Sequence, residues 1–274
     1  MSWRLLDFEG NAYEMYAALR AIVNEVVEQR SPNTVIFSHA KYVGLGTSSV
    51  NTINIEECKK IGIPVVQDTQ LINYKGPSTM DGGPIWLPIV YRYEDTTYPS
   101  DCLIAVDWLI EVIINVCKHF GLEAERSRHR PRSNDIVVKT KKISGVSADK
   151  YGDSMIMGSS FLSDFDFKLA DKILKIPRLR FMAKPHYTSK GWPHYTLEDQ
   201  LMTLRKALGR EVPPAEVKEV FIKVLERKFE MKLIKSGLTE REEEQFKELL
   251  PTFTSDQHNF GKNIGYYEAI KDRL

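Results

Sequence analysis

An alternation of strand-like and helix-like segments at the start of the chain is the feature that most constrains its fold. Apolar side chains at three- and four-residue steps predict helices, and short β-branched or aromatic runs predict strands. The predicted order is a strand at 4–6, a helix from Asn11, a strand at 34–37, a helix at 55–61 stopped by Gly62, and a strand at 63–66. This order favours an α+β (α/β) fold, a mixed β-sheet flanked by helices.

The remaining segments continue the pattern around one strongly apolar helix. Residues 101–120 predict a helix whose polar residues form a single narrow stripe, so most of its circumference is expected to be buried. The other predicted elements are strands at 85–93 and 154–161 and helices at 167–174, 215–229 and 239–250. Irregular segments are expected at 43–46 as a turn, at 67–84 as a loop and at 178–195 as a linker or crossing loop. Two domains are therefore expected, at 1–180 and 195–274.

The composition and net charge of the chain do not point to a particular class of binding partner. Its 274 residues carry a formal net charge of +1, with 42% hydrophobic and 27% charged residues. These values are ordinary for a soluble globular protein and give no overall attraction to nucleic acid or membrane, so neither is expected as a partner. The sequence begins without a signal-peptide core, and polar residues interrupt its most apolar segment, 102–117, so a cytoplasmic location is expected.

The stretch 134–147 carries the most distinctive chemistry. Residues 136–138 predict a short strand, a cationic turn follows, and a second strand begins at Ile143, which indicates a hairpin. Lys142, the last lysine of the turn, is expected at the mouth of the second strand. Gly145 is close by, and its missing side chain lets a ligand approach. A surface hairpin with solvated lysines is the alternative, and composition alone favours it.

Several segments, taken in order, resemble the lipoate–protein ligase A and octanoyltransferase family of the biotin/lipoate A/B protein ligase superfamily. The signature is Asn134-Asp135-Ile136 followed by Lys141-Lys142-Ile143-Ser144-Gly145. The other matching segments are 43–46, 61–66, 160–166, 238–242 and 254–261. The resemblance covers most of the chain. It implies the mixed sheet and flanking helices of biotin and lipoate ligases, with a small helical carboxy-terminal domain at 195–274.

The resemblance implies an acyltransferase that attaches lipoyl or octanoyl groups to a lysine of a lipoyl-domain protein. Lys142 is then the catalytic residue, because a fixed ammonium can hold the activated acyl group and stabilise developing negative charge in a water-poor pocket. The implied cofactors are lipoate or lipoyl-AMP, with ATP and Mg if the chain makes the adenylate; no set of protein metal ligands is implied. The residues implied to bind substrate are Gly46, Leu71, Ile72, Asp81, Gly83, Asn134, Asp135, Ser144 and Gly145.

One segment departs from the family pattern. The family usually carries two arginines, a glycine triplet and a His-Asp pair, whereas residues 67–74, which follow the corresponding strand, read QDTQLINY. Asp81 keeps the acidic position with Gly83 nearby, and Met157 or Gly158 stands where the family has a histidine. This departure motivates an alternative function: a non-catalytic homologue that binds a second ligase-like protein or a lipoyl-domain protein.

Two further chemistries remain open on the sequence. Cysteine-dependent acyl transfer, the competing mechanism within the family, needs a thiol activated by a basic neighbour. Among Cys58, Cys102 and Cys117, only Cys117 has a histidine close in sequence, His119. The basic loop 126–132, which reads RSRHRPR, is either a solvated connector or a site for phosphate or carboxylate.

Overall fold

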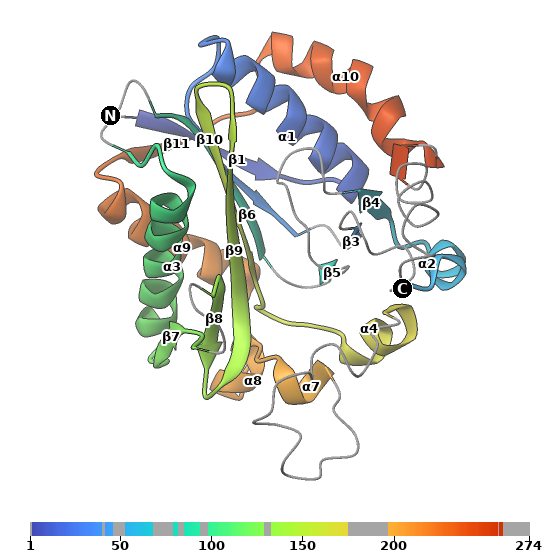
Figure 1. Cartoon of the computed structure of the whole chain (residues 1–274), viewed down its shortest axis with the longest axis vertical. Helices are drawn as coiled ribbons and strands as arrows, with labels where there is room; N and C mark the ends of the chain where they lie inside the picture. The colour runs from blue at the N-terminus through green and yellow to red at the C-terminus, as the bar shows by residue number, and fades with distance from the viewer. Residues whose placement is uncertain are drawn as a thin grey trace, which may run out of the picture.

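The computed structural model describes most of the chain. The described residues are 2–39, 42–45, 53–67, 79–81, 85–93, 98–128, 133–174, 197–256 and 258–259, with the backbone alone at 42–45, 67 and 79–81. In these ranges helices pack on both faces of a mixed sheet, which confirms the predicted fold class (Figure 1). None of the described helices is long and apolar enough to cross a membrane.

The main sheet has eight strands in the order β11-β1-β2-β6-β10-β9-β8-β7. Their bounds are β1 Ser2–Phe8, β2 Thr34–Ser38, β6 Ile85–Arg92, β7 Ala124–Arg126, β8 Asp135–Val138, β9 Lys141–Tyr151, β10 Ser154–Phe161 and β11 Lys232–Lys235. Strand β1 runs parallel to both of its neighbours, β11 and β2, and the strands from β2 to β7 pair antiparallel. A smaller sheet has the order β4-β3-β5, with β3 at Tyr42–Leu45, β4 at Val65–Gln67 and β5 at Thr79–Asp81.

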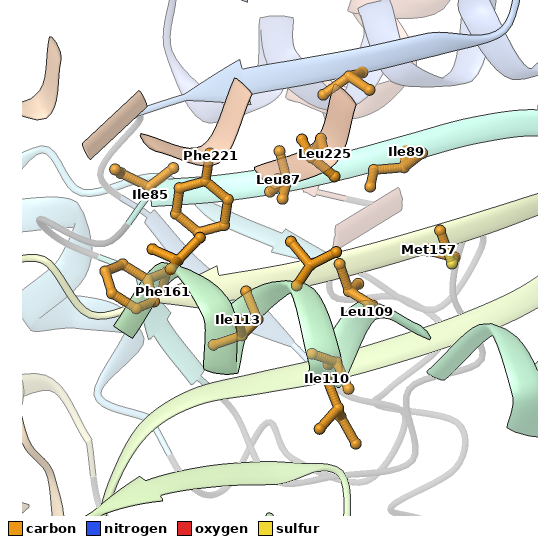
Figure 2. Close-up of a cluster of buried hydrophobic side chains, with 14 of the residues drawn as sticks. Ile85, Leu87, Ile89, Leu109, Ile110, Ile113, Met157, Phe161, Phe221 and Leu225 are labelled. Carbon is orange, nitrogen blue, oxygen red and sulfur yellow. The ribbon is translucent and has the colours of Figure 1, made fainter. Parts of the chain in front are cut away.

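One core lies between the main sheet and the helices α3 (Cys102–His119) and α9 (Pro214–Lys228). Figure 2 shows where they meet, with Ile85, Leu87 and Ile89 of β6, Met157 and Phe161 of β10, Leu109, Ile110 and Ile113 of α3, and Phe221 and Leu225 of α9. Each of these side chains is at most 5% exposed. Burying an apolar side chain of this size contributes about 1.5–3 kcal/mol, so this core firmly supports β9 and β10.

Local sequence explains why α3 forms and which side it buries. Asp101 caps the helix, because its carboxylate accepts hydrogen bonds from the backbone N–H groups of Leu103 (2.8 Å) and Ile104 (3.1 Å). The predicted polar stripe is confirmed, with Asp107 and Glu111 exposed. Leu103 and Ile104 depart from it, being 51% and 52% exposed in the first turn.

A second core lies on the opposite face of the sheet, beneath α1 (Ala12–Val27) and α10 (Glu240–Thr254). Both helices begin with a capping box, at Asn11 and at Thr239, as expected for these residues. The two helices run side by side in Figure 1, and the Asn24 amide of α1 donates to the Gln245 side chain of α10 at 3.0 Å. Helix α10 therefore forms an outer layer over α1.

The segment expected to form an accessory domain packs into both of these cores. Its strand β11 extends the main sheet beside β1, α9 contributes to the core beneath α3, and α10 covers α1. Arg4 of β1 also forms a buried ion pair with Glu242 of α10, through bonds of 2.5 and 2.6 Å. The division into domains at 1–180 and 195–274 stays a prediction about independent folding, and these shared cores do not favour it.

A third, smaller core gathers segments beside β9 and β10. It joins α2 (Ile55–Ile61), α4 (Phe167–Ile173) and α7 (Leu197–Gln200) with the end of β10. Its buried members are Ile53, Cys58, Val65, Leu162, Phe165, Ala170 and Ile173. Helix α8 (Leu204–Leu208) follows directly and returns the chain to the first core. The third core thus lies next to the start of β9, where Leu201 forms a bridge with Lys142.

Three expectations about local structure are wrong. Residues 42–45 form strand β3 where a turn was expected at 43–46, and Thr79–Asp81 forms β5 within the expected irregular segment 67–84. Both strands are held by pairing with residues distant in sequence, which leaves no local pattern. Helix α10 also continues beyond 250 to Thr254, with Pro251 inside it.

Candidate functional site

The hairpin turn is tighter than the sequence predicts. Only Lys139 and Thr140 form it, both with positive φ (50° and 72°), as in the two-residue turns that suit the twist of paired strands. Lys141 and Lys142 are therefore the first residues of β9, where a longer cationic turn was expected. Because neighbouring side chains point to opposite faces of a strand, the two lysines face different surroundings.

A β-bulge sets the direction of Lys142. Ile136 faces Ser144 across the hairpin and Val137 faces Lys142, so one extra residue, Ile143, stands between the two pairs. Ile143 and Ser144 are both fully buried, whereas Lys142 is 40% exposed at its side chain. The bulge thus turns the lysine away from the core.

The same bulge brings Lys142 over Gly145. A Cβ atom placed on Gly145 would lie 2.9 Å from Nζ and 3.2 Å from Cε of Lys142, closer than ordinary contact. Glycine therefore leaves room for the lysine side chain in this position, and a larger residue would displace the ammonium. The sequence predicts that these two residues lie close together. The missing side chain of Gly145 makes room for the Lys142 side chain, and not only for a ligand.

Asp135 completes this cluster. Its Oδ1 lies 2.7 Å from the Lys142 ammonium, with the carboxylate 33% exposed. Asp135 pairs directly with Gly145 across the hairpin, and its backbone accepts a hydrogen bond from Ser127 N–H at 2.8 Å. The site therefore consists of one ammonium and one carboxylate, both half exposed, above a glycine.

Ser144 and Asn134 take different positions from Lys142. The Ser144 hydroxyl is buried and lies 2.8 Å from the Ser159 hydroxyl, on the face of the sheet that packs against α3. Asn134 precedes β8, and its backbone carbonyl accepts from Val146 N–H at 3.0 Å. Of the residues expected to bind substrate, Asp135 and Gly145 lie beside the Lys142 ammonium. Ser144 does not, because its hydroxyl contacts Ser159 instead.

The remaining candidates lie mostly outside the described residues. Asp81 ends β5, where its backbone pairs with Tyr42 of β3; its side chain is outside the description. Gly46, Leu71, Ile72 and Gly83 also fall outside the described part of the chain.

Sequence reasoning missed a segment that fixes the backbone of Lys142. Met202 N–H donates to the Lys142 carbonyl at 2.8 Å, and Leu201 forms a bridge with Lys142. The Lys141 ammonium donates to the carbonyl of Glu198 in α7 at 3.0 Å. Each of these contacts involves a main-chain carbonyl or N–H group, so the pattern of side-chain types gave no signal for them. They tie the start of β9 to the third core, in which Leu201 also packs.

The cysteines show no sign of activation. Burial raises the pKa of Cys117 to about 12 and the pKa of Cys58 to about 11. Burial also raises the pKa of Cys102. Since the thiolate is the nucleophile, all three groups are poorly suited to acyl transfer at neutral pH.

The described part of the basic loop is engaged with carboxylates. Arg126 donates to Asp107 of α3 at 2.6 Å and to the Ser133 carbonyl at 2.7 Å. Arg128 pairs with Glu125 at 2.9 Å. Residues 129–132 lie outside the described part of the chain, so the anion-binding hypothesis for this loop stays a prediction.

A comparison with models of protein families shows which family the chain belongs to. The model of the lipoyl protein ligase A/B catalytic domain matches residues 80–226, more than half of the sequence. This chain belongs to that family. The match includes β8, β9 and Lys142, and it runs across the expected boundary between 180 and 195. No curated protein sequence matches the chain.

Solved structures of lipoate ligases share the fold. Lipoate-protein ligase A bound with ATP has a TM-score of 0.77 at 18% identity, over 96% of this chain and 100% of that one. A bi-partite lipoate protein ligase from Thermoplasma acidophilum, analysed with its E2 lipoyl domain, has a TM-score of 0.75 at 19% identity, over 96% and 97%. Protein Ta0514 from T. acidophilum with bound lipoic acid has a TM-score of 0.75 at 17% identity, over 95% and 99%. At such identities the likeness shows the fold.

Proposed function

We propose that this chain is a lipoate–protein ligase-like acyltransferase that attaches lipoyl or octanoyl groups to a lysine of a lipoyl-domain protein. The observation that carries the proposal is Lys142, whose ammonium lies half exposed above Gly145 on a strand of the family's catalytic domain. Structures with the same fold contain lipoic acid or ATP, which supports both as substrates of this chain.

The proposed reaction has two steps. The acyl carboxylate first displaces pyrophosphate from ATP to give an acyl-adenylate, and the acceptor lysine then attacks the acyl carbonyl and releases AMP. Lys142 binds the phosphate, which is negatively charged, and the carbonyl oxygen, which becomes negatively charged during the attack. Electrostatic stabilisation of this kind is usually the largest single contribution to catalysis.

A second candidate is a homologue that does not form the adenylate itself. The departure of residues 67–74 from the family pattern favours it. The bi-partite ligase of T. acidophilum has the same fold, which supports a second ligase-like protein as a partner of this chain. Such a chain would bind a partner or a lipoyl domain, and it could still transfer an acyl group that is already activated.

A transfer assay separates these functions. The purified protein is incubated with lipoate or octanoate, ATP, Mg²⁺ and a lipoyl domain, and a parallel reaction supplies preformed lipoyl-adenylate. The acyltransferase predicts a mass gain on the acceptor, which disappears when the acceptor lysine is replaced by arginine. A gain from the adenylate alone favours transfer without adenylation. No gain in either reaction, with the protein folded by circular dichroism, contradicts the acyltransferase.

A further inference from the structure

The Lys142 ammonium is already paired with a carboxylate from its own hairpin. Its Nζ lies 2.7 Å from Asp135 Oδ1, the distance of a charge-assisted hydrogen bond. An anionic group that binds Lys142 must therefore displace this carboxylate or share the ammonium with it. Resting on the proposed function, we propose that Asp135 is an internal competitor that occupies Lys142 and sets its affinity for anionic acyl ligands.

The position of Asp135 suits this exchange because its backbone is held independently of Lys142. The Asp135 carbonyl accepts from Ser127 N–H at 2.8 Å, its N–H donates to the Ser133 hydroxyl at 3.3 Å, and it lies in register with Gly145. Losing the lysine contact therefore leaves the strand in place. The carboxylate can turn away while the hairpin keeps its shape.

The exposure of both partners keeps the cost of exchange low. The Lys142 and Asp135 side chains are 40% and 33% exposed, so water can solvate each charge when the pair opens. Ion pairs at such positions contribute little, whereas a hydrogen bond between a charged group and a ligand held in a fixed site contributes more. An acyl carboxylate or phosphate can thus replace Asp135, but with an affinity reduced by the competition.

Gly145 lies where Asp135 and a bound ligand would exchange on the Lys142 ammonium. A Cβ atom on this residue would lie 2.9 Å from the Lys142 Nζ and 3.5 Å from Asp135 Oδ1. The ammonium therefore lies against the backbone of β9, where the carboxylate reaches it from the neighbouring strand. A ligand that replaces Asp135 meets the ammonium already in position.

The test is a double-mutant cycle on ligand binding. Calorimetry measures octanoate and lipoate binding to the parent, Asp135→Asn, Lys142→Met and the double variant, in buffer without nucleotide or divalent metal. Asp135→Asn is expected to bind about two- to fivefold more tightly, because a half-exposed ion pair no longer competes. Lys142→Met is expected to bind more weakly. Asp135→Asn is expected to add nothing in the Lys142→Met background.

Asp107→Asn is the matched control. Asp107 pairs with Arg126 at 2.6 Å on the side of the sheet that α3 covers, with 54% of its side chain exposed. The substitution changes net charge equally, so it is expected to leave affinity unchanged. A gain with Asp107→Asn would assign the effect to overall charge and overturn the inference.

The other outcomes separate the inference from the proposed function. Unchanged or weaker binding by Asp135→Asn, with a loss in Lys142→Met, overturns the inference and leaves the function standing. A gain by Asp135→Asn that persists without Lys142 also overturns it. Equal binding by the parent and Lys142→Met, or no binding by any variant, contradicts both.

Discussion

Lys142 and Gly145 lie against each other on one face of β9, although three positions separate them along the strand. Strict alternation would point them to opposite faces, and the bulge at Ile143 removes that difference. The bulge also leaves Ile143 and Ser144 both buried. The four residues Lys142 to Gly145 therefore form one structural unit. Lys142 and Gly145 share one face of β9, and the side chains of Ile143 and Ser144 are buried.

Replacing Gly145 by alanine is expected to displace the Lys142 ammonium. The new Cβ would lie 2.9 Å from Nζ, at the flexible end of a side chain, so the fold can accommodate it while the amine moves. We expect an affinity loss for an acyl-adenylate analogue of about tenfold, approaching that of Lys142→Ala. Calorimetric titration measures this loss.

The control for this substitution is Gly237→Ala, because within the described part of the chain nothing but its own chain neighbours lies within 4 Å of a Cβ at Gly237. It is expected to bind the analogue as the parent does. If Gly145→Ala also binds as the parent does, the close packing of Gly145 and Lys142 has no role in ligand binding.

The buried hydroxyl pair of Ser144 and Ser159 predicts a stability effect. Their oxygens are 2.8 Å apart and both residues are nearly fully buried. Ser144→Ala leaves the Ser159 hydroxyl without this partner and is expected to lower the free energy of unfolding by about 1–3 kcal/mol. The double variant Ser144→Ala/Ser159→Ala is expected to recover much of the loss. Urea denaturation measures the free energy of unfolding of the two single variants, Ser144→Ala and Ser159→Ala, and of the double variant. A loss in the double variant that equals the sum of the two single losses would contradict the account.

The ion pair of Arg4 with Glu242 predicts a loss of stability in acid. Burial raises the pKa of Glu242, but hydrogen bonds from the Arg4 guanidinium and the Thr239 N–H outweigh this effect, so the pKa lies below its usual value of 4.5. The unfolded chain then binds more protons than the folded one just below that value. The contribution is fully present above pH 4.5 and is lost as the pH falls through the lowered pKa.

Glu242→Gln tests this dependence through unfolding curves between neutral pH and pH 3. The variant is expected to lose about 3–5 kcal/mol at neutral pH, because it leaves Arg4 buried without its charge partner. It is also expected to lose less further stability in acid than the parent. The control is Glu216→Gln, which opens the exposed pair with Arg210 and is expected to cost much less. Parallel pH curves for the parent and Glu242→Gln would contradict the assignment.

The parts of the fold that local chemistry determines were predictable from the sequence. Asn11 and Thr239 cap helices where expected, and Gly62 ends α2 in a left-handed conformation, because each effect depends on a few neighbouring residues. Strand β3 was missed because its pairing partners lie more than 20 positions away.

Part of the candidate site was predictable from the sequence, but its geometry was not. Asp135 and Gly145 lie beside the Lys142 ammonium, whereas a role of these residues in substrate binding stays a prediction. The bulge depends on how two strands align, and the bond from Met202 joins main-chain atoms distant in sequence. Neither leaves a pattern in side-chain types, so neither could be read from one sequence.

The central claim is that Lys142 binds the anionic part of an activated acyl group, and one calorimetric comparison tests it most directly. The parent, Lys142→Ala and Lys141→Ala are titrated with a non-hydrolysable analogue of lipoyl-adenylate. Lys142→Ala is expected to lose a charge-assisted contact of about 1.5–3 kcal/mol, roughly a 10- to 100-fold loss in affinity, with little change in melting temperature. Lys141, which donates to the Glu198 carbonyl from the other face of β9, is expected to be replaceable without loss. Equal affinity of all three proteins for the analogue would contradict the account.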